Sequence, residues 1–277
     1  MVVANGTRIP ALGLGTWPMK GEACARAVAS ALAVGYRHID TAAMYANEEA
    51  VGEGLRASGV PRSEVFVTTK VWHDHIGRGD LQRSAEASLS RLGLDQVDLL
   101  LIHWPNRAIP VSEAIGALCD AHQRGLTKAI GISNFPTALI EQAITATTVP
   151  IACNQVEYHP HLDQSKVIAA CRAHGLAVVS YCPLGRPGVG GMLAESAIAE
   201  IAARHGKTPA QIALRWHVQQ PGVIAVPKSE NPERQRQNLD VFDFELTSAE
   251  MQVLDSLARP DGRVVNLAIA PDWDVAA

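Results

Sequence analysis

Residues 35–42 have the sequence GYRHIDTA, and they show a pattern that repeats along the chain. Gly35 follows a stretch with helical spacing, Ala23–Val34, and glycine is common just past the end of a helix. The run Tyr36–Asp40 is short and lacks the alternation of a half-exposed strand, so it predicts a buried strand. A helix, a glycine and a buried strand in this order are typical of a parallel α/β protein.

The alternation of strand and helix continues to residue 228. Further helical stretches lie at Glu48–Ser58, Leu81–Leu92 and Ser112–Arg124. The eight predicted strands are Ala11–Gly15, Tyr36–Asp40, Val65–Lys70, Val97–His103, Ala129–Ser133, Cys153–Glu157, Leu176–Tyr181 and Val223–Lys228. Eight such units favour closure into a (β/α)₈ TIM barrel over an open sheet. Because 277 residues suit one barrel, we expect a single domain over residues 1–277.

Three additions to the barrel are expected. Asn5-Gly6 between short apolar stretches predicts an N-terminal β-hairpin with a primed turn. One extra helix is expected between Gly185 and Gly206, before the last barrel helix begins near Thr208. A second extra helix is expected in the tail that starts at Val241.

The composition argues against several classes of protein. A formal charge of −4 provides no basic field for nucleic acid or an anionic membrane. The five cysteines are an odd number without C-x-x-C spacing, so neither a disulfide framework nor a zinc knuckle is indicated. The first residues lack a signal peptide, and no apolar run approaches a membrane span. We therefore expect a soluble, cytoplasmic protein with reduced thiols.

Polar side chains stand at the ends of most predicted strands. Because the carboxyl ends of barrel strands converge on one mouth, these side chains are expected to meet there. The set holds an acid, a base, an imidazole, a phenol and hydrogen-bonding groups: Asp40, Lys70, His103, Ser133, Asn134, Tyr181 and Lys228. A single polar residue at a strand end is common where a loop begins, whereas this many together indicate a functional site.

Tyr45 lies in the loop after the second strand, where it can fold over the mouth. Its phenol holds a proton at neutral pH, and a nearby ammonium would lower its pKa. Lys70 can supply that ammonium with Asp40 as counter-ion, so the set is a proton donor suited to an alkoxide forming from a carbonyl. The alternative is a buried ion pair covered by a tyrosine.

The sequence resembles the aldo-keto reductase family over nearly its whole length, from about Ile9 to Leu254. The motifs are residues 35–42, Ile102–Pro105, Gly131–Phe135 and Pro227–Ser229. The chain is most similar to short bacterial members of the 2,5-diketo-gluconate reductase type. The resemblance implies NADPH-dependent reduction of aldehydes or ketones to alcohols, on small carbonyls, diketones or keto-sugars, by a protein that is usually monomeric.

The resemblance also implies roles for individual residues. Four positions match the family's catalytic residues: Asp40, Tyr45, Lys70 and His103. Tyr45 matches the general acid and His103 the residue that orients the carbonyl. The positions that match the cofactor site are Gly15, Thr16, Asp40, Ser133, Asn134, Gln155, Tyr181, Leu184, Gly185, Val226, Lys228, Ser229, Asn231, Arg234, Gln237 and Asn238. Among these, Tyr181 matches the aromatic residue that stacks on the nicotinamide ring.

Positive charge after the eighth strand favours NADPH over NADH. Barrels often bind phosphate near the last two strands, and Lys228, Arg234 and Arg236 lie there. Arginine suits bidentate contact with a 2′-phosphate. The alternative is ordinary solvated surface charge. Gly13-Leu14-Gly15 does not continue into a G-x-G-x-x-G motif, so a Rossmann site is not supported.

Tryptophans follow three strand ends and are expected to line an apolar substrate pocket. They are Trp17, Trp72 and Trp104, and the alternative for each is a place in the core. Trp273 lies in the tail, where the family closes its pocket.

The sequence departs from the family at two places near the mouth. The family often has glycine where this chain has Ala46, and alanine restricts the backbone more than glycine does. The loop from Trp104 to about Pro110 is short, which suggests an open pocket and broad selection.

Two other readings of the mouth remain. His73-Asp74-His75 could bind zinc in a barrel hydrolase, although no complete ligand set surrounds these residues, and we expect no metal. The chain could also be a cofactor-binding sensor that keeps the fold without turnover. The intact set of four residues argues against a sensor.

Overall fold

The computed structural model describes residues 1–186, 188 and 191–274, and its centre is a sheet of eight parallel strands. Neighbouring strands pair in chain order from β3 to β10. Their bounds are β3 Leu14–Gly15, β4 His38–Asp40, β5 Phe66–Val71, β6 Val97–Ile102, β7 Thr127–Ser133, β8 Ile151–Glu157, β9 Ala177–Tyr181 and β10 Val223–Ala225. The first strand, β3, is the shortest with 2 residues, and β4 and β10 have 3 residues each.

Backbone hydrogen bonds close this sheet into a barrel. Leu12, just before β3, forms a parallel bridge with Ala225 of β10. The Gly13 amide donates to the Ala225 carbonyl at 2.9 Å, and the Ala225 amide donates to the Ala11 carbonyl at 3.0 Å. Gly15 is packed so closely at this seam that a Cβ would stand 2.6 Å from the Val226 carbonyl oxygen. The predicted (β/α)₈ barrel is therefore confirmed.

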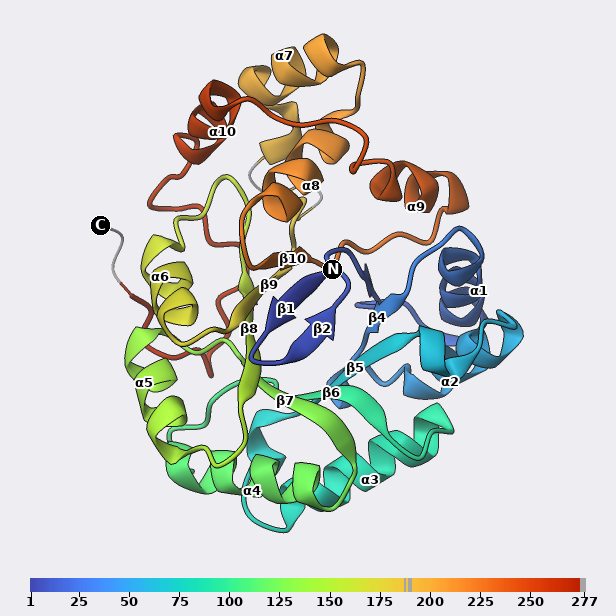
Figure 1. Cartoon of the computed structure of the whole chain (residues 1–277), viewed down its shortest axis with the longest axis vertical. Coiled ribbons are helices and arrows are strands. Elements are labelled where there is room, and N and C mark those ends of the chain that lie inside the picture. Colours follow the sequence, from blue (N-terminus) through green and yellow to red (C-terminus); the bar gives the residue numbers. More distant parts are fainter. Residues whose placement is uncertain (187, 189–190, 275–277) are drawn as a thin grey trace.

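Helices surround the barrel, as Figure 1 shows. The helices between and after the strands are α1 Gly21–Ala33, α2 Glu48–Ala57, α3 Asp80–Leu92, α4 Val111–Gln123, α5 Thr137–Ala146, α6 Ser165–Ala173, α8 Pro209–Gln219 and α9 Pro232–Leu239. The two extra helices are α7 Ser196–His205 and α10 Ser248–Asp255. Short 3₁₀ helices are η1 Ala43–Tyr45, η2 Arg62–Glu64, η3 His73–His75 and η4 Met192–Ala194.

The expectation that the last barrel helix begins near Thr208 was wrong. Thr208 does cap a helix, α8, by accepting a hydrogen bond from the Gln211 amide. However, α9 follows β10 and completes the ring. Its sequence is almost entirely polar, and buried Gln235 rather than an apolar stripe faces inward. The 3.6-residue apolar pattern that reveals most helices is therefore absent there.

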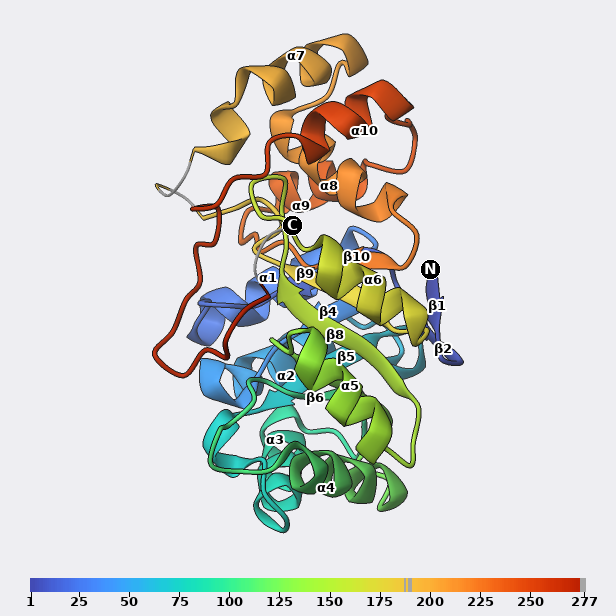
Figure 2. The same ribbon diagram turned by 90° about the vertical axis from the view of Figure 1, so that its left-hand side faces the viewer.

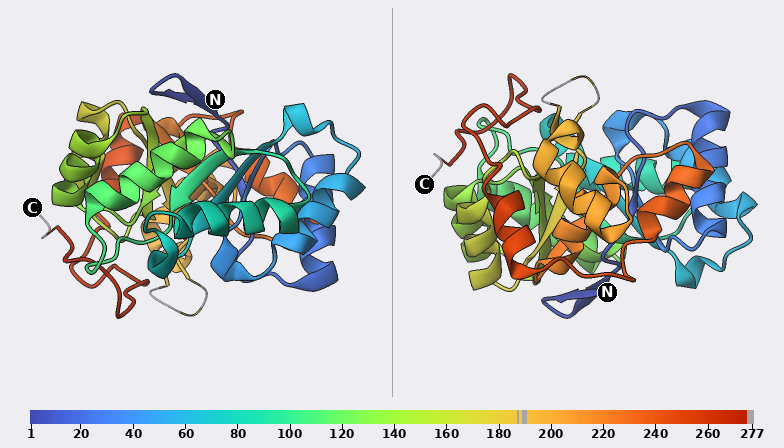
Figure 3. Two further views of the ribbon diagram at one scale, coloured as in Figure 1. Left: turned by 90° about the horizontal axis from the view of Figure 1, so that it is seen from below. Right: turned by 90° about the horizontal axis from the view of Figure 1, so that it is seen from above.

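The two faces of the barrel have different coverings. The predicted hairpin forms from β1 Val2–Ala4 and β2 Thr7–Ile9, with Asn5 and Gly6 at φ 44° and 83°. Figures 2 and 3 show this hairpin on one face, with the loop after β9 and the C-terminal tail at the opposite face. The hairpin closes the amino end of the barrel and leaves the carboxyl ends of the strands for the tail to cover.

Apolar side chains fill both the inside of the barrel and the layer beneath the helices. The inner cluster includes Ile9 from the hairpin, Leu99 and Leu101 from β6, and Ile224 from β10. Because the lower interior is packed, the polar strand ends can only meet at the carboxyl mouth. In the described part of the chain, no helix is long and apolar enough to cross a membrane.

Candidate active site

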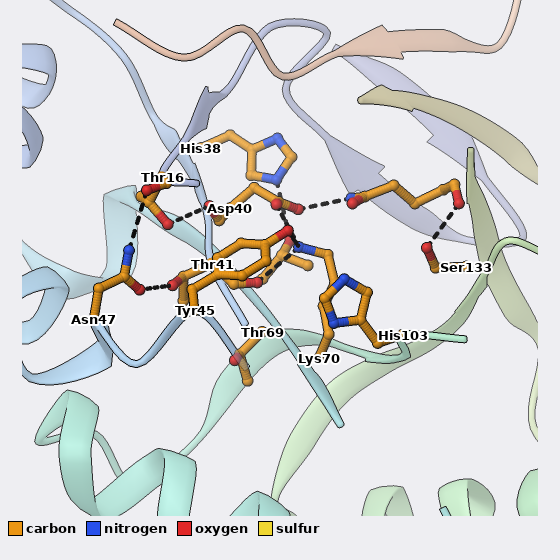
Figure 4. A network of polar contacts seen from close by, with 12 residues as sticks. Thr16, His38, Asp40, Thr41, Tyr45, Asn47, Thr69, Lys70, His103 and Ser133 are labelled. Atoms are coloured by element: carbon orange, nitrogen blue, oxygen red, sulfur yellow. Dashed lines mark hydrogen bonds and ion pairs between the residues drawn. The ribbon is translucent and has the colours of Figure 1, made fainter. Parts of the chain in front are cut away.

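An ion pair between two strand ends lies at the bottom of the mouth (Figure 4). Lys70 Nζ lies 2.5 Å from Asp40 Oδ1, and neither side chain is more than 3% exposed. Lys70 also donates to the Thr41 carbonyl at 2.8 Å, and Gln155 Nε2 donates to the second Asp40 oxygen at 2.7 Å. Both Asp40 oxygens and two of the three Lys70 donors therefore have partners, which favours a stable buried ion pair.

Tyr45 points into the same mouth from the end of η1. Lys70 Nζ lies 3.3 Å from its hydroxyl and 4.9 Å from its ring centre. Its ring contacts Trp17 at 5.2 Å and His103 at 5.5 Å between centroids. Lys20 hydrogen-bonds the Tyr45 carbonyl from outside, which fixes the backbone. The structure thus brings together the four predicted catalytic residues.

The direction of the Tyr45 pKa differs from the expected one. Burial raises this pKa above its usual value, and the Lys70 ammonium opposes the rise without cancelling it. Burial would also lower the pKa of Lys70, but Asp40 outweighs it and the pKa is raised. The phenol therefore holds its proton firmly beside a charged lysine. The expectation of a lowered pKa ignored the desolvation of the phenolate.

His103 lies just past β6 and is neutral. Burial, with smaller contributions from Lys70 and His73, holds its pKa well below the usual value. Its Nδ1 is buried and has no hydrogen-bond partner among the described residues. The ring packs edge-on against Trp72, with centroids 5.2 Å apart. A neutral imidazole can donate one hydrogen bond without competing with Tyr45 as an acid.

Ala46 adopts a left-handed backbone directly after Tyr45, with φ 48° and ψ 45°. This conformation strains a residue that carries a Cβ. We expect Ala46→Gly to raise the free energy of unfolding by about 0.5–1 kcal/mol. The measurement is a urea denaturation midpoint. Ala43→Gly, in ordinary 3₁₀ backbone, is the control and should lower the midpoint; a lower midpoint for Ala46→Gly as well would contradict the strain.

The four residues matched to the nicotinamide form one hydrogen-bonded chain. The Tyr181 hydroxyl donates to Asn134 Oδ1 at 2.8 Å, and Asn134 Nδ2 donates to the His103 carbonyl at 3.0 Å and to Ser133 Oγ at 3.1 Å. Ser133 Oγ donates in turn to the Gln155 carbonyl at 2.8 Å. Asn134 has φ 63°, so the chain turns sharply here to set its amide beside the mouth. Amides and a half-buried phenol ring suit a planar carboxamide-bearing ring.

The remaining cofactor candidates lie on either side of this chain. Thr16 Oγ1 donates to the Asp40 carbonyl at 3.0 Å, and Gly15 packs on Val226. Leu184 and Gly185 are half-buried in the loop after β9. Thr16 contacts Asp40 of the mouth, and Leu184 and Gly185 follow Tyr181 closely along the chain.

The residues matched to the adenosine end lie after β10 and are less uniform. Arg234 is exposed at the start of α9, whereas Lys228 pairs with Glu230 at 2.5 Å. Asn231 caps α9 by accepting from the Glu233 and Arg234 amides. Gln237 contacts Glu233, and the buried members are Ser229 and Asn238. An exposed arginine at a helix N-terminus suits a phosphate group.

The tryptophans predicted for the pocket lie in different environments. Trp17 is 44% exposed at the rim, and Trp72 is half-buried against His103. Trp104 is 3% exposed because the tail covers it, with Trp273 at 5.9 Å between ring centres. Trp17 and Trp72 therefore flank Tyr45 and His103, and Trp104 lies beneath the tail.

Two buried polar residues of the mouth were missed by sequence reasoning. Asn47 accepts from the Thr41 hydroxyl at 2.7 Å and donates to the Thr16 carbonyl at 3.1 Å, so it ties two loops together. Glu157 accepts from the Val264 and Val265 amides at 2.6 and 2.8 Å. Asn47 lies two residues after Tyr45, so its place in the chain could have indicated it, whereas nothing local indicates a contact between Glu157 and the tail.

The histidines considered for zinc were located in the structure. No group of three or more His, Cys, Asp or Glu side chains that could hold an ion occurs among them. His73 contacts Asn106 through its carbonyl, and His75 lies beside Asp74 on the surface.

The sequence was compared with known families and proteins. Residues 11–259 match the model of the aldo/keto reductase family. The chain belongs to this family. The aldo-keto reductases are oxidoreductases, and the ion pair, the phenol and the imidazole described above lie at the positions that the resemblance implied.

Individual aldo-keto reductases align with almost the whole chain. One from Mycolicibacterium smegmatis is 42% identical, covering 95% of this chain and 96% of its own. The methylglyoxal reductase DkgB of Escherichia coli O157:H7 is 41% identical, covering 96% and 99%. A solved structure provisionally assigned as a 2,5-diketo-D-gluconic acid reductase B has a TM-score of 0.94 at 46% identity, covering 99% and 98%.

Proposed function

We propose that this aldo-keto reductase is an NADPH-dependent carbonyl reductase in which Tyr45 is the general acid. The observation that carries the proposal is the Tyr45 hydroxyl 3.3 Å from a lysine ammonium that is itself paired with a buried carboxylate. A phenol in this position can protonate an oxygen that gains negative charge. The ammonium then stabilises the phenolate that remains.

The reduction requires a hydride and a proton. When bound, the reduced nicotinamide supplies the hydride to the carbonyl carbon. The carbonyl oxygen lies between Tyr45 and His103 in the proposed complex, where the neutral imidazole donates a hydrogen bond and holds the oxygen in line with the phenol. Tyr45 gives its proton to that oxygen, and Lys70 offsets the charge left behind.

The cofactor preference is proposed from the cations after β10. Arg234 is exposed and offers the fork that binds a phosphate by two hydrogen bonds. Because the 2′-phosphate distinguishes NADPH from NADH, this arginine would favour NADPH. Lys228 would contribute after exchanging Glu230 for the phosphate. Asn134, Gln155 and Tyr181 are proposed to hold the nicotinamide.

The substrate class is proposed to be small aldehydes, diketones or keto-sugars. The names of the relatives include a methylglyoxal reductase, and the rim at Trp17 is open to solvent. A short loop joins His103 to α4, which begins at Val111. We further propose that the protein acts as a cytoplasmic monomer in one domain, without nucleic acid.

The function is tested by oxidation of NADPH, followed by absorbance, with methylglyoxal, a diketone and a keto-sugar. We expect turnover with NADPH and weaker turnover with NADH. Arg234→Ala should weaken binding of NADPH by about 10-fold or more and binding of NADH little. Equal losses for both cofactors would contradict the phosphate contact. Tight NADPH binding without turnover of any carbonyl would favour the sensor.

A further inference from the structure

The segment after β10 carries basic residues but no net charge. Residues 228–240 hold three acidic residues as well as three basic ones, so the formal charges cancel. The basic residues are Lys228, Arg234 and Arg236, and the acidic residues are Glu230, Glu233 and Asp240. A cation that is already paired must exchange its partner before it can bind a ligand, so the acids decide which cation is available.

The three cations differ in their partners. Lys228 Nζ lies 2.5 Å from Glu230 Oε1, and Arg236 Nη1 lies 2.8 Å from Glu233 Oε2. Among the described residues, the Arg234 guanidinium has no ion-pair or hydrogen-bond partner. A phosphate that reaches this segment therefore meets one free guanidinium and an ammonium that a carboxylate already occupies.

The backbone around Glu230 is anchored on both sides, which keeps its carboxylate close to Lys228. On one side, the Asn231 amide donates to Ser229 Oγ at 3.2 Å, and the Asn231 side chain caps α9. On the other side, the Pro227 carbonyl accepts a backbone amide of β3 at 3.0 Å. Both members of the ion pair therefore lie in one short turn between two fixed points.

The amides at the start of α9 do not replace Lys228 as donors. Asn231 Oδ1 accepts from the amides of Glu233 and Arg234 at 2.9 and 3.1 Å. Because these amides are engaged, the side chains of Lys228 and Arg234 are the cationic donors that remain. A guanidinium fork and an ammonium suit a dianionic group, so this donor set fits the 2′-phosphate of NADPH.

The Glu230 carboxylate affects the two cofactors differently. A 2′-phosphate has to displace the carboxylate from Lys228 or bind beside a like charge, and each costs free energy. The ribose of NADH has a 2′-hydroxyl in the same place, and a carboxylate is the usual acceptor for that hydroxyl in dinucleotide sites. The same side chain therefore opposes one cofactor and tolerates the other, and such a difference changes selectivity.

We propose that Glu230 is a specificity-determining residue that competes with the 2′-phosphate for Lys228 and so narrows the preference for NADPH over NADH. The proposal rests on the proposed reductase function and its nicotinamide cofactor. Removal of this one carboxylate should therefore make the enzyme more selective for NADPH, because it releases a lysine that is already in place.

Glu230→Gln is tested against Glu233→Gln as the matched control. Both substitutions remove one exposed negative charge from the same segment and release a cation, but only the first releases Lys228. Dissociation constants of NADPH and NADH are measured by quenching of tryptophan fluorescence. We expect Glu230→Gln to raise the ratio of the NADH constant to the NADPH constant by about fivefold or more, and Glu233→Gln to change this ratio by less than about twofold.

Two results of this comparison would overturn the proposal. Equal rises of the ratio in both variants would mean that the general field of the segment, and not Glu230, sets the preference. An unchanged ratio in Glu230→Gln would mean that its pair with Lys228 is ordinary surface charge.

A pair of adenosine nucleotides tests the site without hydride transfer. Adenosine 2′,5′-bisphosphate and 5′-AMP differ only in the 2′-phosphate, and calorimetric titration of the protein without cofactor measures both. We expect Glu230→Gln to tighten binding of the bisphosphate by about fivefold or more and to change binding of 5′-AMP by less than about twofold.

The titration separates failure of the inference from failure of the proposed function. A wild type that prefers the bisphosphate, with no greater preference in Glu230→Gln, would overturn the role of Glu230 and leave the NADPH site standing. Equal binding of both nucleotides in both proteins would refute the 2′-phosphate site and the inference together. If the wild type reduced no carbonyl, the reductase function would fail, whereas the titration would still decide the role of Glu230.

Discussion

Tyr45→Phe is expected to lower kcat by about 10²–10⁴-fold while leaving the affinity for NADPH unchanged. Of the groups at the mouth, the Tyr45 hydroxyl is the proposed proton donor. His103 is neutral, and the raised pKa of Lys70 keeps its ammonium charged and bound to Asp40. Phenylalanine preserves the ring contacts with Trp17 and His103. The loss should therefore fall on the chemical step, measured in single turnover with saturating cofactor.

A second tyrosine provides the control for this result. Tyr158 is buried and donates its hydroxyl to Gln220 at 2.8 Å, just after α8, and its ring packs on Trp216 of that helix. Tyr158→Phe removes a hydroxyl of the same kind at a distance from the mouth and should leave kcat within about twofold. Near-wild-type turnover of Tyr45→Phe, with intact binding of NADPH, would remove Tyr45 from the role of general acid.

Lys70→Met is expected to reduce both stability and activity. Methionine leaves the Asp40 carboxylate buried with only the Gln155 amide, and breaking such a pair costs about 3–5 kcal/mol of unfolding free energy. Turnover should fall by at least about 10²-fold, because no ammonium then stabilises the phenolate of Tyr45. Urea denaturation and steady-state rates measure the two effects separately.

The double variant Asp40→Asn/Lys70→Met separates the two consequences. Removing both charges ends the cost of an unpaired carboxylate, so most of the lost stability should return. Activity should not return, since the ammonium is still missing. A single Lys70→Met variant as stable as the wild type would contradict the account of the buried pair, and recovery of turnover in the double variant would contradict the role of Lys70.

The catalytic residues could be predicted because each follows from a local pattern. Asp40, Lys70 and His103 stand at or beside the ends of strands that are recognisable as short buried runs, and the barrel then brings those ends together. Tyr45 could be assigned to the mouth because it lies only five residues after Asp40 in the chain. The direction of its pKa could not be predicted, because the sequence shows the lysine but not the burial that outweighs it.

The parts that escaped prediction depend on long-range contacts or on missing apolar patterns. Helix α9 has no apolar stripe, since its inward face uses Gln235 to hydrogen-bond the Ala27 and Ser229 carbonyls. The bonds from Glu157 to the tail join residues more than 100 positions apart. A buried glutamate in a strand predicts some partner, but no local rule says that the partner is a distant backbone amide.

Glu157 links the barrel to the tail without touching the four catalytic candidates. Its carboxylate accepts two backbone amides, so this attachment of the tail does not depend on the side chains of Val264 and Val265. Substitutions there can change which molecules enter without disturbing the proton donor or its lysine. The attachment of the tail and the ion pair beside Tyr45 therefore depend on separate contacts.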